Sequence, residues 1–94
     1  MSQVFQGETV SREYVFRDRS GVLLDPDSIS VKVVNAVGQV VATPELTRTG
    51  EGVYELHFNV PEDAVAGVWE IYVTASKGAF TRKHRDSFEV LAAK

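Results

Sequence analysis

The 94-residue sequence contains no cysteine, a single methionine and only three prolines. Without cysteine the chain can form neither a disulfide nor a thiolate metal site, and it has no cysteine nucleophile. It also lacks an apolar run near the ~20 residues that a membrane-spanning helix needs. The first residues show neither the basic region nor the apolar stretch of a secretory signal peptide. These absences predict a protein that is made in the cytoplasm and has no membrane partner.

The charge is mildly acidic overall but unevenly distributed. Ten Lys and Arg residues stand against thirteen Asp and Glu residues, which gives a net charge of −3. Binding of a phosphate backbone requires a basic surface, so we expect no nucleic-acid partner. Near the C-terminus, however, no acid interrupts a basic stretch that holds Lys77, Arg82, Lys83 and Arg85. Such a stretch either keeps an exposed edge strand from pairing with other chains or docks onto an acidic surface of a partner protein.

Apolar and polar residues alternate along most of the chain, as in strands that bury one face. The clearest run covers residues 54–60, whose even-numbered members are all apolar. Turn signals such as Asn35-Ala36-Val37-Gly38 and Lys77-Gly78-Ala79 separate the runs, and residues 62–66 are too few for more than one helical turn. Strands are predicted over residues 3–6, 9–18, 28–35, 39–47, 52–60, 67–76 and 80–91. This pattern predicts an all-β fold, a seven-stranded antiparallel β-sandwich that forms one domain over residues 1–94.

The predicted core follows from the alternation. Trp69 shares its parity with Ile71 and Val73, so we expect the indole at the centre of the core rather than on a ligand surface. The full predicted core is Val10, Tyr14, Phe16, Ile29, Val31, Val33, Tyr54, Leu56, Phe58, Val60, Trp69, Ile71, Val73, Phe88 and Val90.

Four short motifs occur in a fixed order along the chain: Gly7-Glu8-Thr9-Val10, Asp18-Arg19-Ser20-Gly21, Gly52-Val53-Tyr54 and Gly67-Val68-Trp69. Together they resemble the bacterial immunoglobulin-like (Ig-like) module, and the resemblance covers nearly the whole chain. Two branches share these motifs. One comprises macroglobulin-like and cell-surface Ig repeats of large secreted chains. The other, to which the Asp25-Pro26 step is more similar, comprises short free-standing proteins from head and neck gene clusters of tailed bacteriophages.

The resemblance implies an Ig-like β-sandwich with a non-catalytic structural role. In the phage setting this is a small virion component that decorates the head or joins head and neck by docking onto a repeating protein lattice. The alternative is a cell-surface or carbohydrate-binding Ig-like module that meets a host-surface glycan. That alternative requires an exposed aromatic platform, for which the candidates are Phe5, Tyr72 and Phe80.

No arrangement of residues in the sequence indicates a reaction. The two histidines, His57 and His84, lie on different predicted strands, and no serine–histidine–acid set or HExxH motif occurs. Asp18, Asp25 and Asp27 flank a loop but lack the spacing of a calcium-binding loop, and their role in turns explains them. We therefore expect no enzyme activity, no metal site and no cofactor.

The N-terminal residues Val4 and Phe5 are apolar at a place where chains usually fray. Such residues either tie a first strand into the chain's own sheet or bind a neighbouring subunit. Val4 and Phe5 therefore join the basic stretch as candidate partner-binding residues.

Overall fold

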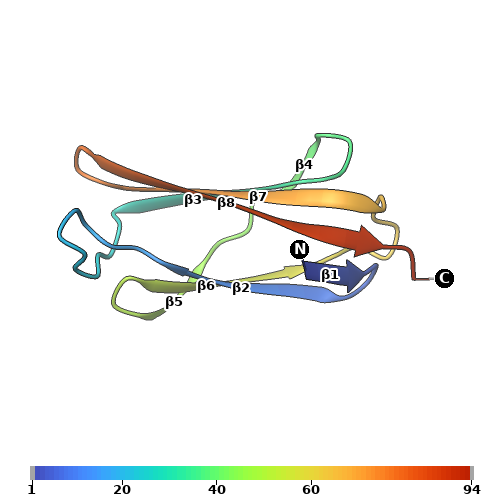
Figure 1. Ribbon diagram of the computed structural model, residues 1–94, viewed down its shortest axis with the longest axis horizontal. Helices are drawn as coiled ribbons and strands as arrows, with labels where there is room; N and C mark the ends of the chain where they lie inside the picture. The colour runs from blue at the N-terminus through green and yellow to red at the C-terminus, as the bar shows by residue number, and fades with distance from the viewer. Residues whose placement is uncertain (1, 94) are drawn as a thin grey trace.

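The computed structural model describes residues 2–93. This part of the chain contains eight strands, joined by turns and loops, and no helix. No candidate membrane-spanning helix therefore lies within that range. The strands are β1 (Ser2–Phe5), β2 (Thr9–Val15), β3 (Ser28–Val34), β4 (Val40–Ala42), β5 (Thr47–Gly50), β6 (Val53–Asn59), β7 (Gly67–Lys77) and β8 (Phe80–Leu91). One sheet has the order β1-β8-β7-β3-β4 and the other the order β2-β6-β5. The sheets lie face to face as two layers (Figure 1), which confirms the predicted all-β sandwich.

The apolar faces of the two sheets form one core around Trp69. The indole ring lies 5.9 Å from the Phe88 ring and 6.2 Å from the Phe58 ring, and its N–H donates to the Val65 carbonyl at 2.8 Å. Every predicted core residue is buried except Ile29, which is half-buried. The period-2 pattern therefore identified the core correctly.

Two features of the strand arrangement differ from the prediction. The predicted strand 39–47 is two strands, because the chain leaves the first sheet after Ala42 and joins the second sheet at Thr47. Pro44 lies in this crossover and has no N–H to donate to a ladder. In addition, β1 runs parallel to β8, pairing Ser2 with Phe88 and Phe5 with Leu91, whereas all other described strand pairs are antiparallel.

The predicted turns form through side-chain acceptors. Asp18 Oδ1 accepts the N–H groups of Ser20 at 2.8 Å and Val22 at 3.0 Å. Asn35, which is buried, accepts two N–H groups of the turn that links β3 to β4 in the same way. Short polar side chains thus replace backbone partners where the chain reverses.

Gly52 occupies the tightest backbone approach in the fold. Its φ is 70°, in the left-handed region that favours glycine. A Cβ at this position would lie 2.8 Å from the Phe16 carbonyl oxygen and 2.9 Å from the Leu24 nitrogen. The loop that follows β2 can therefore pack on the β5–β6 hairpin only because residue 52 has no side chain.

Candidate protein-docking surface

The predicted basic stretch does not form one continuous patch. Residues of even number in β8 face the second sheet, as the buried Phe88 and Val90 show, and residues of odd number face outward. Lys83 and Arg85 are therefore on the outer face, while Arg82 lies on the inner side at the edge of the sandwich. Lys77 is exposed at the end of β7, beside the predicted Gly78-Ala79 turn.

Arg85 already has a partner within its own sheet. Its guanidinium donates two hydrogen bonds to Glu70 Oε2, the Nε bond being 2.7 Å long, and it lies 5.5 Å from the centre of the Tyr72 ring. The Arg85 bonds, followed by the bond from the Tyr72 hydroxyl, lower the pKa of Glu70 below its ordinary value of 4.5. Arg85 is thus held in an intramolecular ion pair and offers less free charge than the sequence implied.

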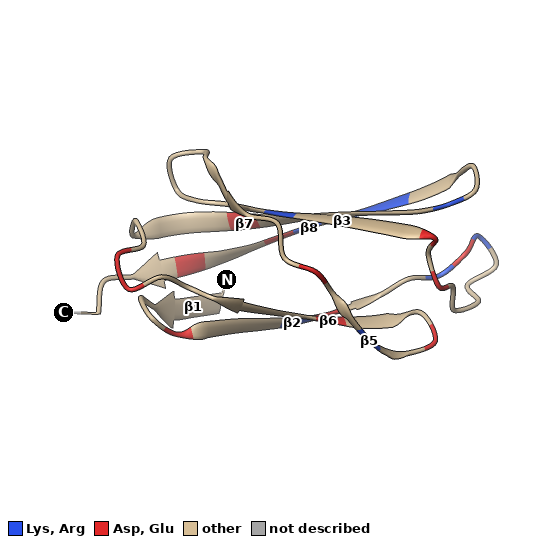
Figure 2. Cartoon of the chain, turned by 180° about the vertical axis from the view of Figure 1, so that it is seen from behind, with Lys and Arg blue, Asp and Glu red and all other residues tan. Residues whose placement is uncertain are grey.

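Arg82 contacts the backbone of Arg17, a residue that the sequence analysis did not include among its candidates. Its guanidinium lies 5.1 Å from the centre of the Phe80 ring, and its Nε donates to the Arg17 carbonyl at 3.4 Å. Arg17, Arg82 and Lys83 line one shallow pocket of about 190 Å³, whose other lining residues are Val15, Phe16 and His84. We call Arg17, Arg82 and Lys83 the basic end; Figure 2 shows Lys and Arg gathered there, on the β7–β8 hairpin and on the loop after β2. Within residues 2–93 none of these three cations forms an ion pair with a carboxylate.

The backbone beside the basic end is also unpaired. β1 covers only Phe88–Leu91 of β8, so among residues 2–93 the earlier part of β8 has no neighbouring strand on that side. The Leu91 carbonyl accepts a hydrogen bond from the Gln6 N–H, directly after β1, so the backbone groups of Leu91 face the β1 side of β8. Along a strand, the backbone groups of successive residues point alternately to the two sides. The N–H and C=O groups of Lys83 and Arg85 therefore point to the open side.

Val4 and Phe5 lie in β1, within the chain's own sheet. Val4 packs on the core, and Phe5 is 49% exposed beside Leu91. Of the two candidate residues, Phe5 therefore presents the more open apolar surface.

A polar cluster between the sheets was missed by the sequence analysis. Arg12 Nε lies 2.7 Å from Asp86 Oδ2, which ties β2 to β8, and Arg12 also donates to the Ser2 hydroxyl at 2.5 Å. The nearby Tyr14 hydroxyl is buried with no hydrogen-bond partner among the described residues. Burial, followed by the charge of Asp86, raises the pKa of Tyr14 to about 12. Arg12 shares the inward parity of Val10 and Tyr14, and a cation at such a position is the sequence signal for this cluster.

Asp25 joins three segments at the same end of the molecule. Its Oδ1 accepts from Arg48 Nε at 3.1 Å, from the Gly52 N–H at 2.9 Å and from the Tyr54 hydroxyl at 3.2 Å. These bonds, that from Arg48 foremost and then that from Gly52, lower the pKa of Asp25 to about 2. Asp18 and Asp27 bind other groups, and no metal-sized cluster of three acidic or histidine side chains occurs among residues 2–93.

The remaining candidates lie apart from one another. Tyr72 lies beneath Lys32 and Arg85, whereas Phe80 lies beneath Arg82 at the opposite end of β8 from Phe5. The three aromatic rings thus form no common platform. His84 packs on the rings of Tyr14 and Phe16, at 5.8 and 5.4 Å, and His57 contacts Ser11 and Glu55 on the outer face of the second sheet.

Comparisons with known proteins place this geometry in a family. The family model described as the MG2 domain matches residues 6–90. No curated protein matches the sequence significantly. Among solved structures, the chain is similar to Salmonella alpha-2-macroglobulin reacted with methylamine, at 26% identity and a TM-score of 0.74. That match covers 96% of this chain but only 6% of the macroglobulin chain.

Two further solved structures share the fold. The Lin-41 filamin domain has 16% identity and a TM-score of 0.67, over 96% of this chain and 83% of its own. The endo-beta-1,4-mannanase from Thermotoga petrophila has 20% identity and a TM-score of 0.66, over 97% of this chain and 18% of its own. The family match begins before β2 and ends near the end of β8, so it covers most of the chain. The chain therefore belongs to the MG2 domain family and has the macroglobulin-like variant of the Ig-like sandwich.

Proposed function

We propose that this MG2 domain is a non-catalytic docking module whose basic end binds an acidic surface of a partner protein. The observation that carries the proposal is that Arg17, from the loop after β2, lines one pocket with Arg82 and Lys83 of β8, and that no carboxylate pairs with these three cations within residues 2–93. Opposite charges across an interface steer association and fix its orientation. The unpaired backbone of β8 beside these cations offers additional hydrogen bonds to an incoming segment.

Two settings suit such a module. Our sequence-based hypothesis is a small virion component of a tailed phage, made in the host cytoplasm and bound to a capsid or neck lattice. The likeness to part of a long alpha-2-macroglobulin chain favours the other setting, in which the domain docks against neighbouring domains or proteins of a macroglobulin-like assembly. Mass spectrometry of purified phage particles separates them, because only the first setting requires stoichiometric amounts of the protein in the particle.

The docking mode is testable with a fluorescent ten-residue poly-glutamate peptide as the probe. Lys83→Glu should weaken binding at least about fivefold in fluorescence anisotropy, since the substitution reverses one charge of the basic end. Lys32→Glu is the matched control, because Lys32 is another exposed lysine of the same sheet, on β3. The difference should shrink with added salt, as the Debye length falls from about 10 Å at 0.1 M to about 3 Å at 1 M. Equal effects of the two substitutions would overturn the proposal.

A further inference from the structure

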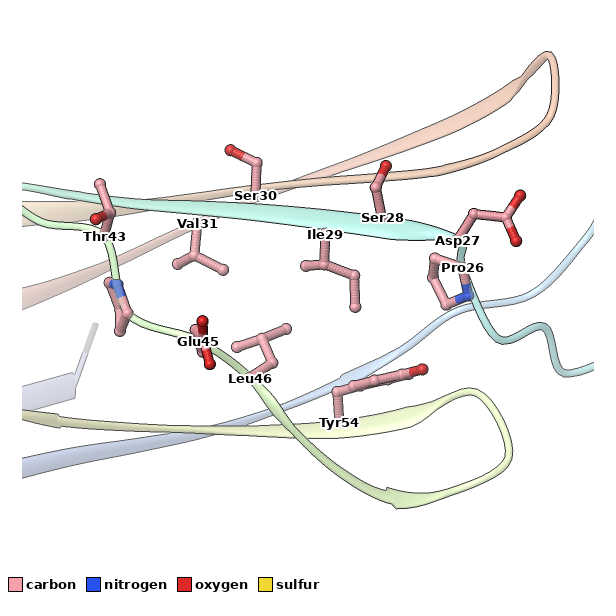
Figure 3. Close-up of a pocket in the computed structure, with 11 residues that line it drawn as sticks. Pro26, Asp27, Ser28, Ile29, Ser30, Val31, Thr43, Glu45, Leu46 and Tyr54 are labelled. Atoms are coloured by element: carbon pink, nitrogen blue, oxygen red, sulfur yellow. The ribbon is translucent and has the colours of Figure 1, made fainter.

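A second surface, distant from β8 in the sheet order, has the properties of a peptide-binding groove. It lies between the first half of β3 and the crossover of residues 43–46, and its volume is about 530 Å³. Ligand sites in proteins commonly fall between about 300 and 1,000 Å³. Figure 3 shows the groove opening between the two sheets, bounded by Pro26 at one end and by the crossover at the other.

The floor of the groove is apolar. Ile29 and Val31 point from β3 into the gap between the sheets, and Leu46 and Tyr54 face them from the opposite side (Figure 3). Ile29 and Leu46 are only half-buried, although both pack on the core. The floor therefore leaves apolar surface that a further side chain can cover.

The wall formed by β3 is an open strand edge. β4 pairs only with Val33 and Val34, so in the described part of the chain the earlier residues of β3 have no neighbouring strand on that side. Asp27 N–H donates to the Ser76 carbonyl on the β7 side, and Asn35 N–H donates to Gln39 on the β4 side.

The direction alternates along β3 (Ser28–Val34), so the Asn35 bond places the N–H and C=O groups of odd-numbered β3 residues on the β4 side. Asp27 lies before the strand, and its bond to Ser76 is out of the strand register, in which Ser28 is the partner of Ser76. The N–H and C=O groups of Ile29 and Val31 point toward the groove. Within residues 2–93 no backbone hydrogen bond joins either residue to the crossover.

The rim of the groove carries negative charge. Asp27 and Glu45 are exposed lining residues, and the lining contains no Lys, Arg or His among the described residues. The nearby Arg48 is held by Asp25. The charge of the groove is thus opposite to that of the basic end.

We propose that this groove binds an extended segment of a partner polypeptide, which adds as a strand to β3. The unpaired groups of Ile29 and Val31 supply the backbone hydrogen bonds of the new ladder. Alternate apolar side chains of the segment fill the gap over Leu46 and Tyr54, and a Lys or Arg of the segment pairs with Asp27 or Glu45. Main-chain bonds of this kind give affinity, and the pockets for alternate side chains give specificity. The site shares no residue with the basic end and goes beyond the function proposed above.

The test uses a display library of random twelve-residue peptides, selected on the full chain. Enriched peptides should alternate apolar residues and contain Lys or Arg. On binding, the selected peptide should slow hydrogen exchange at the Ile29 and Val31 amides. Acidic consensus peptides, or no enrichment, would overturn the proposal. Exchange protection of the same amides without peptide, rising with protein concentration, would overturn it in favour of a second copy of the chain.

Edge-proline variants make the test specific to the strand. Ile29→Pro removes the groove-facing N–H and should weaken the selected peptide at least tenfold, whereas Ile29→Val keeps that N–H and should stay within about threefold. Glu13→Pro is the matched control, since the Glu13 N–H faces the open side of β2, away from β6.

Glu45→Lys provides a second, surface variant that does not depend on the fold tolerating a proline, and it too should weaken binding at least about fivefold. Unchanged binding in both Ile29→Pro and Glu45→Lys would refute the groove. Lys83→Glu should leave peptide binding intact, so a failure of this proposal is distinguishable from a failure of the basic end.

Discussion

Replacing Gly52 by alanine tests the close approach that fixes one end of the sandwich. The Gly52 carbonyl accepts from Phe16 N–H at 2.8 Å, and its own N–H donates to Asp25 at 2.9 Å. An added methyl group would meet backbone atoms at 2.8 and 2.9 Å, and backbone cannot move aside as a flexible side chain can. The matched control is Gly38→Ala, because Gly38 has a similar φ of 85° but no atom within 4 Å of the position of a Cβ.

The expected losses follow from these two environments. Left-handed backbone costs a residue with a Cβ roughly 1–2 kcal/mol, and both variants incur that cost. Overpacking adds about 1–3 kcal/mol at Gly52 alone. For a domain of this size each kcal/mol lowers the melting temperature by roughly 4–8 °C, so Gly52→Ala should melt roughly 5–20 °C below Gly38→Ala.

Urea denaturation and thermal melts followed by Trp69 fluorescence measure both variants. Free energies of unfolding that agree within about 0.5 kcal/mol would refute the reasoning, since both sites have positive φ and an added Cβ is crowded by backbone only at Gly52. A selective loss at Gly52 would show that the loop after β2 and the β5–β6 hairpin pack as the structure describes.

Three further results are expected. Trp69→Ala should lower the free energy of unfolding by roughly 3–5 kcal/mol in urea, and Trp69→Phe by less, because Phe keeps a ring and loses mainly the bond to Val65; equal losses would contradict a central indole. Tyr14→Phe should leave stability unchanged or raised at pH 7, since the buried hydroxyl has no partner among the described residues. Because the pKa of Tyr14 is about 12 in the fold against 10 unfolded, it also contributes stability that is lost as pH rises from 10 to 12, and melts of the variant should lose less in that window. The pKa of Asp25 is about 2 in the fold against 3.8 unfolded, so its ionised carboxylate contributes stability above pH 4 that is lost as pH falls toward 2. In thermal melts, Arg48→Met should reduce the fall in melting temperature over this pH range, whereas Arg17→Met should not.

The sequence predicted the core well because burial on one face of a strand leaves a direct trace in the alternation of residues. Val33, Leu56 and Ile71 needed only their parity to be placed. Strand pairing leaves no such trace. The change of sheet between β4 and β5 and the parallel pairing of β1 with β8 depend on contacts between segments far apart in the chain.

For the candidate sites too, the residue types were visible in the sequence, but the contacts between distant segments were not. Lys83 and Arg82 were identified from the sequence, but Arg17 joins them only through the loop after β2. Arg85 was a candidate partner-binding residue, and its pairing with Glu70, which the sequence does not show, arises from the register of β7 and β8. The groove could not be predicted, because Ile29 has the same parity as fully buried residues and only the short length of β4 leaves it open.

The parallel pairing of β1 with β8 has a consequence for how the domain is made. Residues 2–5 pair with residues 88–91, so β1 cannot form its strand pairing until the ribosome has synthesised and released almost the entire domain. Chains that depend on such distant pairings fold slowly, on the scale of milliseconds to seconds. The opening segment therefore remains available to chaperones or to incorrect strand partners throughout synthesis, and its capture by β8 is the step that closes this window.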